Sequence, residues 1–155
     1  MTHSSVEDFW QAYIDSLPPG AELPTGGYSV WHFCDNESDA NELARLARDG
    51  VKTATCGLLW SYEAEGETVP QSGDFSVVTD WLGRPICVIQ TVEVQVKSFD
   101  QVDAAFAYDE GEGDRSYEYW RQAHWRAFTR ECQSLGRSPQ ENMSVVCERF
   151  RTIFP

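Results

Sequence analysis

A lysine and a threonine three residues apart are the side chains of this sequence best placed, by type and spacing, to carry out chemistry. They are Lys52 and Thr55, within the segment of residues 50–56. A helical turn or a tight loop brings the amine of Lys52 near the hydroxyl of Thr55, and such a pairing activates a weak nucleophile. The same residues also fit a helix that ends at Gly50, followed by an exposed lysine and the start of a strand. The spacing alone leaves both interpretations open.

An acidic segment rich in glycine offers a third chemical group, Glu110. Its carboxyl group can hydrogen-bond or protonate a departing amine, and the next glycines, Gly111 and Gly113, let the backbone approach a ligand closely. A lysine buried beside apolar walls has a depressed pKa and takes a proton from a hydroxyl. We therefore predict a site in which Lys52 activates Thr55 and Glu110 assists. The alternative for Glu110 is a solvated charge in an acidic loop.

Five side chains near these motifs are candidates for contact with a substrate. They are Thr53, Trp60, Arg115, Tyr119 and His124. An indole such as that of Trp60 can stack on a base. An imidazole such as that of His124 titrates near neutral pH, although a single histidine on an aromatic helix is more often a packing residue.

The charge balance bears on the kind of partner. The chain of 155 residues has 25 acidic and 12 basic residues, a formal net charge of -13. Such a field repels a polyanion unless the cations gather on one face, and it permits a neutral ligand such as a nucleoside. We expect a nucleoside or single-stranded RNA as the partner, with the small ligand favoured. The sequence does not indicate an oligomeric state.

Cysteine usage and glycine patterns bear on location and cofactors. The five cysteines are odd in number and scattered, which disfavours a disulfide framework and is typical of a reducing cytoplasm. No apolar run has the length of a membrane helix, so we expect a cytoplasmic protein without a membrane partner. No glycine loop for phosphate and no paired metal-ligand spacing occurs, and we expect neither a cofactor nor a metal.

Hydrophobic periodicity and turn residues predict one α+β domain over residues 1–155, with an N-terminal helical extension over about residues 1–27. Helices are expected over residues 6–17, 36–48, 99–108 and 116–135. Strands are expected over residues 28–33, 53–60, 74–79, 86–96 and 144–154, with a loop over residues 63–73.

Taken together, these motifs closely resemble the ASCH domain family, in its longer bacterial branch. The residues that carry the resemblance are Gly50-x-Lys52-Thr53-x-Thr55, the run Ala107-Tyr108-Asp109-Glu110-Gly111-Glu112-Gly113-Asp114, Trp120 and His124. The resemblance covers nearly the whole chain. It implies a PUA-like fold, a small and mostly antiparallel β-barrel flanked by helices.

The resemblance also implies a function related to RNA or nucleosides. One small bacterial branch of the family hydrolyses the amide of N4-acetylcytidine with a lysine, a threonine and a glutamate, which look like Lys52, Thr55 and Glu110. An amidohydrolase acting on an N4-acylcytidine is therefore expected. The alternatives are an RNA-binding module or a metal-independent ribonuclease, and a non-enzymatic regulatory domain. Gly57 stands where shorter members have an arginine, and we expect Arg115 to replace that guanidinium.

Overall fold

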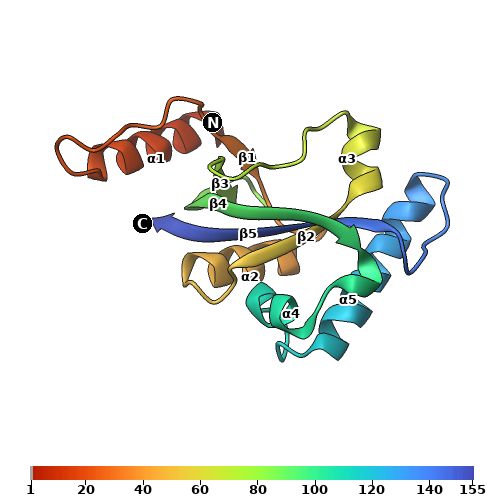
Figure 1. Ribbon diagram of the computed structural model, residues 1–155. Helices are drawn as coiled ribbons and strands as arrows, with labels where there is room; N and C mark the ends of the chain where they lie inside the picture. The colour runs from red at the N-terminus through yellow and green to blue at the C-terminus, as the bar shows by residue number, and fades with distance from the viewer. Residues whose placement is uncertain (1) are drawn as a thin grey trace.

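A curled sheet of five strands forms the centre of the computed structural model, which describes residues 2–155 (Figure 1). Its strands are β1 (Ser29–Trp31), β2 (Ala54–Leu58), β3 (Phe75–Thr79), β4 (Pro85–Ser98) and β5 (Ser144–Phe154). They lie in the order β1-β3-β4-β5-β2. The β1–β3 pair is parallel and the other three pairs are antiparallel. The sheet is a half-barrel with β1 and β2 at its two edges, which confirms the predicted α+β, mostly antiparallel fold.

Helices cover this sheet in three packing clusters. They are α1 (Thr2–Ser16), α2 (Glu37–Arg48), α3 (Leu59–Glu65), α4 (Ala104–Glu110) and α5 (Tyr117–Ser134), with the short 3-10 helix η1 (Phe99–Gln101). Helices α4 and α5 pack on the β2 and β5 side, α2 packs on β4 and β5, and α1 packs on β3 and β4. Figure 1 shows α1 and α5 at opposite ends of the sheet. No helix within residues 2–155 combines the length and apolar character that crossing a membrane requires.

Most predicted elements are confirmed, and two boundaries differ. The strand expected to reach Trp60 ends at Leu58, and α3 follows at once and extends into the expected loop. The sequence hides this change because residues 56–60, which cross the boundary, contain no polar side chain, and so short an apolar run suits a strand and a helix equally. The helix expected over residues 99–108 is divided, because the side chain of Asp103 accepts a hydrogen bond from Phe106 N and starts α4 afresh.

One close approach brings the acidic loop after α4 against the loop before β2. Gly111 ends α4 with a φ of 71°, and a Cβ atom there would lie 2.8 Å from the carbonyl oxygen of Val51. A side chain at this position would therefore collide with backbone, not with a flexible group. Thr53 N also donates a hydrogen bond to Asp109 O at 2.8 Å. These contacts fix the two segments that carry Lys52 and Glu110 relative to one another.

Candidate functional site

The loop between α2 and β2 turns Lys52 into the protein interior. Gly50 adopts a φ of 78°, which reverses the chain after α2. The side chain of Lys52 is 1% exposed. Its Nζ donates hydrogen bonds to Ala54 O at 2.8 Å, to Glu110 O at 3.3 Å and to Glu112 Oε2 at 3.1 Å. The interpretation of an exposed lysine at a helix end is therefore wrong.

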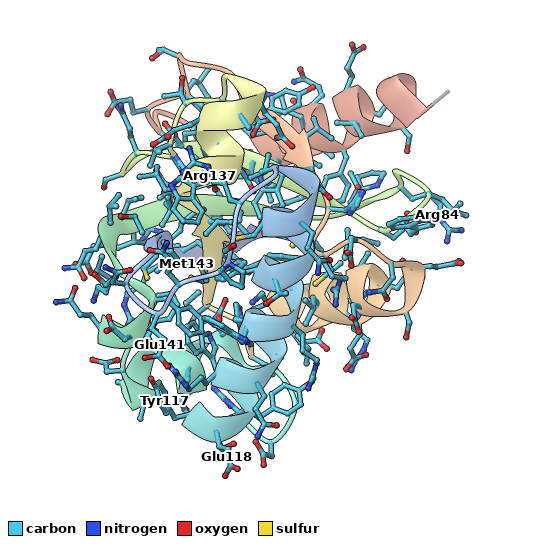
Figure 2. All side chains as sticks on the ribbon, turned by 90° about the vertical axis from the view of Figure 1, so that its right-hand side faces the viewer. Arg84, Tyr117, Glu118, Arg137, Glu141 and Met143 are labelled. Carbon is cyan, nitrogen blue, oxygen red and sulfur yellow. The ribbon has the colours of Figure 1, made fainter. Side chains whose placement is uncertain are left out.

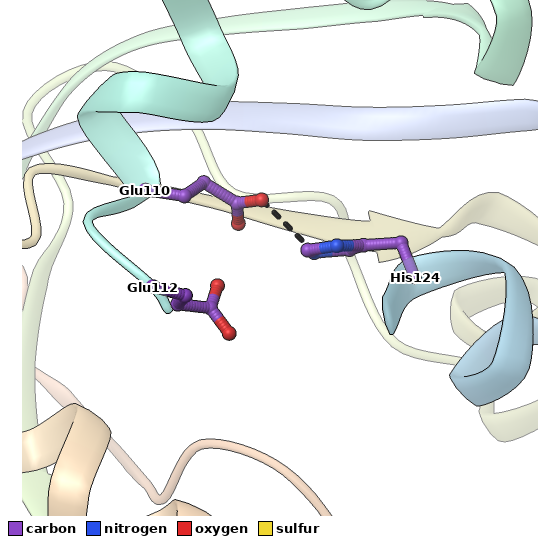
Figure 3. A group of neighbouring side chains, drawn as sticks. All are labelled: Glu110, Glu112 and His124. Carbon is purple, nitrogen blue, oxygen red and sulfur yellow. Dashed lines mark ion pairs between the residues drawn. The ribbon is translucent and has the colours of Figure 1, made fainter. Parts of the chain in front are cut away.

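Glu110, the last residue of α4, is equally buried and lies opposite Lys52. Its Oε2 accepts hydrogen bonds from the indole N–H of Trp120 and from His124 Nε2, the latter at 2.9 Å (Figure 3). Its Oε1 lies 3.6 Å from Lys52 Nζ. Within residues 2–155, this Oε1 atom is buried and has no hydrogen-bond partner. The interpretation of Glu110 as a solvated charge is wrong, and the carboxylate keeps one acceptor position free.

The contacts of His124 define its protonation. Its Nδ1 lies 2.8 Å from the carbonyl oxygen of Trp120, and its Nε2 lies 2.9 Å from the Glu110 carboxylate. Both partners accept hydrogen bonds only, so both ring nitrogens must carry hydrogen. Burial is the largest single influence and lowers the pKa of His124, but the charge and hydrogen bond of Glu110, the charge of Glu112 and the hydrogen bond to Trp120 together raise it. His124 is thus a cation paired with Glu110.

The pKa of Lys52 is raised, which corrects the expectation of a depressed one. Burial lowers it, but the carboxylates of Glu112 and Glu110 together more than offset burial. The pKa of Glu110 is lowered, since the charges of His124 and Lys52 overcome the effect of its burial. Sequence reasoning counted the apolar walls around Lys52 and did not count two carboxylates. We call Lys52, Glu110, Glu112 and His124 the charge cluster; its two cations balance its two anions.

The charge cluster forms part of the wall of a cavity with a volume of about 680 Å³. Thr55 and Tyr119, two further candidates from the sequence, line the same cavity. Within the described residues, Thr55 makes no hydrogen bond with Lys52, whose Nζ bonds instead to the carbonyl oxygen of Ala54. That carbonyl belongs to the peptide that leads into Thr55. The structure therefore places the ammonium beside the threonine backbone and gathers Lys52, Thr55, Glu110, Tyr119 and His124 at one cavity.

Three other predicted contact residues lie elsewhere. Thr53 donates its hydroxyl hydrogen to Asp109 O at 3.2 Å and so ties the two loops together. Trp60, in α3, packs on the hydrophobic core, with the Arg137 guanidinium 4.5 Å from its ring centre. Neither residue is among those that line the cavity.

Arg115 likewise faces away from the cavity. Its guanidinium lies 3.6 Å from the ring centre of Tyr108, and its Nε donates to Tyr108 O at 2.9 Å. The space beside Gly57 is taken by another side chain, because a Cβ atom there would lie 3.1 Å from Tyr62 Cε2. The phenol of Tyr62 therefore occupies the space that a side chain at position 57 would enter.

Sequence reasoning missed two acidic residues of this region. Glu112 pairs with Lys52, and the signal for it was its position between Gly111 and Gly113, two residues after Glu110. Glu148, 5% exposed on β5, lies directly opposite Thr55 on β2. The only sequence feature that included Glu148 was the alternation of side chains along residues 144–154, and this pattern did not indicate a buried carboxyl group.

A metal ion is the other species that such a cluster could hold. Ligand atoms of Glu110, Glu112 and His124 all lie within 4.8 Å of one another (Figure 3). Lys52 Nζ, however, lies 3.1 Å from the Glu112 carboxylate and 3.6 Å from that of Glu110. A divalent cation would have to displace this ammonium and take a proton from His124. In this structure the carboxylates of Glu110 and Glu112 are paired with Lys52 and His124.

The protonation of His124 depends on the charge of Glu110, and the variant Glu110→Gln tests this dependence. We expect the pKa of His124, followed by imidazole NMR, to fall below its ordinary value of 6.5, because burial persists while the carboxylate charge is lost. In the wild type, the raised pKa means that this ion pair stabilises the fold fully below about pH 6.5. That contribution is lost as the pH rises through the folded-state pKa.

The variant Glu141→Gln is the matched control, since this exposed carboxylate pairs with Arg121 on the surface. It should leave the pKa of His124 unchanged. A raised His124 pKa in Glu110→Gln would show that another group holds the proton.

Comparisons with known proteins agree with the fold and the motifs. The family model for the ASCH domain matches residues 29–154. The crystal structure of an ASCH domain from Lactobacillus crispatus JV V101 has a TM-score of 0.92 and 37% sequence identity, and the match covers 98% of this chain and 96% of that chain. No curated protein matches the sequence.

Two further solved structures are similar. Protein EF3133 from Enterococcus faecalis V583 has a TM-score of 0.85 and 31% identity, with 96% of this chain and 88% of that chain covered. The hypothetical protein PH0355, at 15% identity and a TM-score of 0.52, covers 81% of this chain and 97% of its own and shows the fold alone. Since the family model spans residues 29–154 and an ASCH domain structure superimposes on nearly the whole chain, the protein belongs to the ASCH domain family, a PUA-like fold often linked to RNA binding.

Proposed function

We propose that the protein binds an N4-acylated cytidine in the cavity of the charge cluster and hydrolyses its amide. One observation carries this proposal: a buried cation, a buried carboxylate oxygen without a hydrogen-bond partner in the described chain, and a threonine hydroxyl share one cavity wall. These are the parts that acyl transfer to a hydroxyl requires.

The charge of the cavity favours a neutral ligand. Its walls include six acidic residues, Asp35, Asp39, Glu42, Glu110, Glu112 and Glu131, which outnumber the cations Lys52, His124, Arg126 and Arg130. The formal net charge of the chain is -13, so the field at the cavity repels phosphate groups. The positive charge of Lys52 is already compensated by two carboxylates and is not free to hold a phosphate. An uncharged nucleoside meets none of this repulsion.

The catalytic step uses the form of the site in which Lys52 has lost its proton. Glu112, 18% exposed at the cavity wall, connects Lys52 with solvent and provides the route for that proton. The Thr55 hydroxyl then attacks the acyl carbonyl carbon and passes its proton to the Lys52 amine. When the bond between the acyl carbon and N4 breaks, Lys52 returns this proton to N4.

Glu110 assists the departure of the amine. Its Oε1 accepts a hydrogen bond from the hydrogen newly added to N4 and so stabilises the leaving group. Cytidine leaves, and water hydrolyses the ester on Thr55. The His124 imidazolium and the Trp120 indole hold the Glu110 carboxylate in this orientation throughout.

The decisive experiment is the release of cytidine from N4-acetylcytidine by purified protein, followed by chromatography. The variants Lys52→Ala and Thr55→Ala should each lower kcat by at least about 100-fold, because each removes a group that takes part in bond formation. Thr55→Ser should keep measurable turnover. Thr129→Ala removes a hydroxyl that bonds to Trp125 O on α5 and serves as the control. Full turnover in Thr55→Ala would exclude the acyl-threonine route.

The pH dependence gives a second test of the role of Lys52. Because the pKa of Lys52 is raised above 10.5, kcat/KM should rise by about tenfold per pH unit through the neutral range. The variant Glu112→Gln removes the charge that raises this pKa most, so the rise should shift to lower pH. Glu118 lies in the first turn of α5 (Figure 2), and the variant Glu118→Gln should not shift the rise in kcat/KM. A pH profile that is identical in Glu112→Gln and wild type would remove Lys52 as the base.

RNA binding, with or without ribonuclease activity, is the second candidate function. Its support is the fold together with two arginines, Arg126 and Arg130, which lie one helical turn apart on α5 and line the cavity. If these cations contact phosphates, affinity for single-stranded RNA should fall steeply with salt, and Arg126→Ala should reduce the salt dependence. Cytidine binding should be nearly indifferent to salt. RNA affinity that is absent at low salt would exclude this second function.

A further inference from the structure

A second cavity adjoins the first, and Thr55 lies at their junction. Its volume is about 520 Å³. Both cavities are lined by Phe33, Cys34, Thr55 and Cys56. The second cavity extends between the two edges of the sheet, from residues 29–33 at β1 to residues 55–57 on β2. The two cavities are therefore two halves of one cleft, and the proposed reaction uses only the half that contains the charge cluster.

The second cavity contains a buried carboxyl group that the proposed reaction does not use. Glu148 on β5 is paired in register with Thr55 on β2. Directly opposite residues of an antiparallel pair point to the same face of the sheet, with Cβ atoms about 4.5–5.5 Å apart. Glu148 is 5% exposed, and in residues 2–155 its carboxyl group receives one hydrogen bond, from Thr91 Oγ1 to Oε2 at 2.6 Å. The carboxyl group therefore has hydrogen-bonding capacity left for a ligand in this cavity.

The surroundings of Glu148 favour its neutral form. Burial raises its pKa and Asp74 raises it further, while the hydrogen bond from Thr91 and the charge of Lys52 only partly oppose them. Tyr62 of α3 lines the same cavity, and burial raises the pKa of Tyr62 to about 12, so its phenol is neutral. A neutral carboxylic acid presents an O–H donor and a C=O acceptor side by side.

We propose that Glu148 is a specificity-determining residue that binds the N3 and N4 edge of the cytosine ring and thereby holds the acyl group against Thr55. The acid O–H donates to the N3 lone pair, and the acid C=O accepts the N4–H of the amide. The base then occupies the second cavity, and the acyl carbon lies at the junction, within reach of Thr55. This inference rests on the proposed function for the identity of the ligand and adds a residue and a subsite to it.

Calorimetric titration with cytidine tests the inference without any turnover. Glu148→Ala should weaken cytidine binding by about 10- to 100-fold, the effect of losing a two-point contact with a base edge. Glu148→Gln keeps an acceptor for Thr91 and a donor and acceptor for the base, so its affinity should stay within a few-fold of wild type. Glu93→Ala, an exposed carboxylate on β4, is the control and should bind normally.

Two further comparisons separate base recognition from a structural role. 3-Deazacytidine lacks the N3 acceptor, so it should bind wild type more weakly than cytidine does, and Glu148→Ala should abolish that difference. The affinity of wild type for cytidine should fall as the pH rises through the pKa of Glu148, whereas that of Glu148→Gln should be constant. If Glu148→Ala fails to fold, these two results decide the matter with wild type and Glu148→Gln.

The outcomes also distinguish this inference from the proposed function. Equal binding of cytidine and 3-deazacytidine by wild type, or equal affinity of wild type and Glu148→Ala, overturns the role of Glu148 alone. Binding that depends on Glu148 without hydrolysis of N4-acetylcytidine supports the inference and overturns the hydrolase. Absence of cytidine binding by wild type overturns both.

Discussion

The burial of Lys52 between two carboxylates is the interaction on which the rest of the site depends. An isolated ammonium in the interior would lose its proton or unfold the loop, because its hydration is gone. Glu110 and Glu112 offset that loss, and Glu110 in turn needs His124 and Trp120 to occupy its other oxygen. The α4 loop, the α5 helix and the loop before β2 are therefore held together by one set of charges that none of them could bury alone.

This interdependence explains which parts of the site could be predicted from the sequence. Periodicity and turn residues located the strands and most helices, since these depend on local pattern. The motif resemblance identified Lys52, Thr55 and Glu110, which line one cavity. The pKa of Lys52 was predicted in the wrong direction because it depends on the carboxylate of Glu112, sixty positions away in the chain. Local sequence patterns do not reveal that two residues so far apart in sequence are in contact in the fold.

The same limit applies to the residues that sequence reasoning placed wrongly or missed. Trp60 was expected to stack on a base, but it lies in α3, a helix that was not predicted, and packs on the hydrophobic core. Glu148 became visible only when the register of β2 and β5 set it opposite Thr55. Arg115, expected to supply a missing guanidinium, stacks on Tyr108 instead, and a phenol fills the space beside Gly57.

The cleft lies between strands at opposite edges of one continuous sheet, and this has a consequence for how its width is determined. Both walls belong to the same ladder of hydrogen bonds through β1, β3, β4, β5 and β2. The separation of these strands depends on the curl of the sheet, a property of the whole core, while the loops at residues 67–70 and 111–113 complete the lining. Core substitutions that alter the curl would therefore change ligand affinity from a distance, with no contact residue altered.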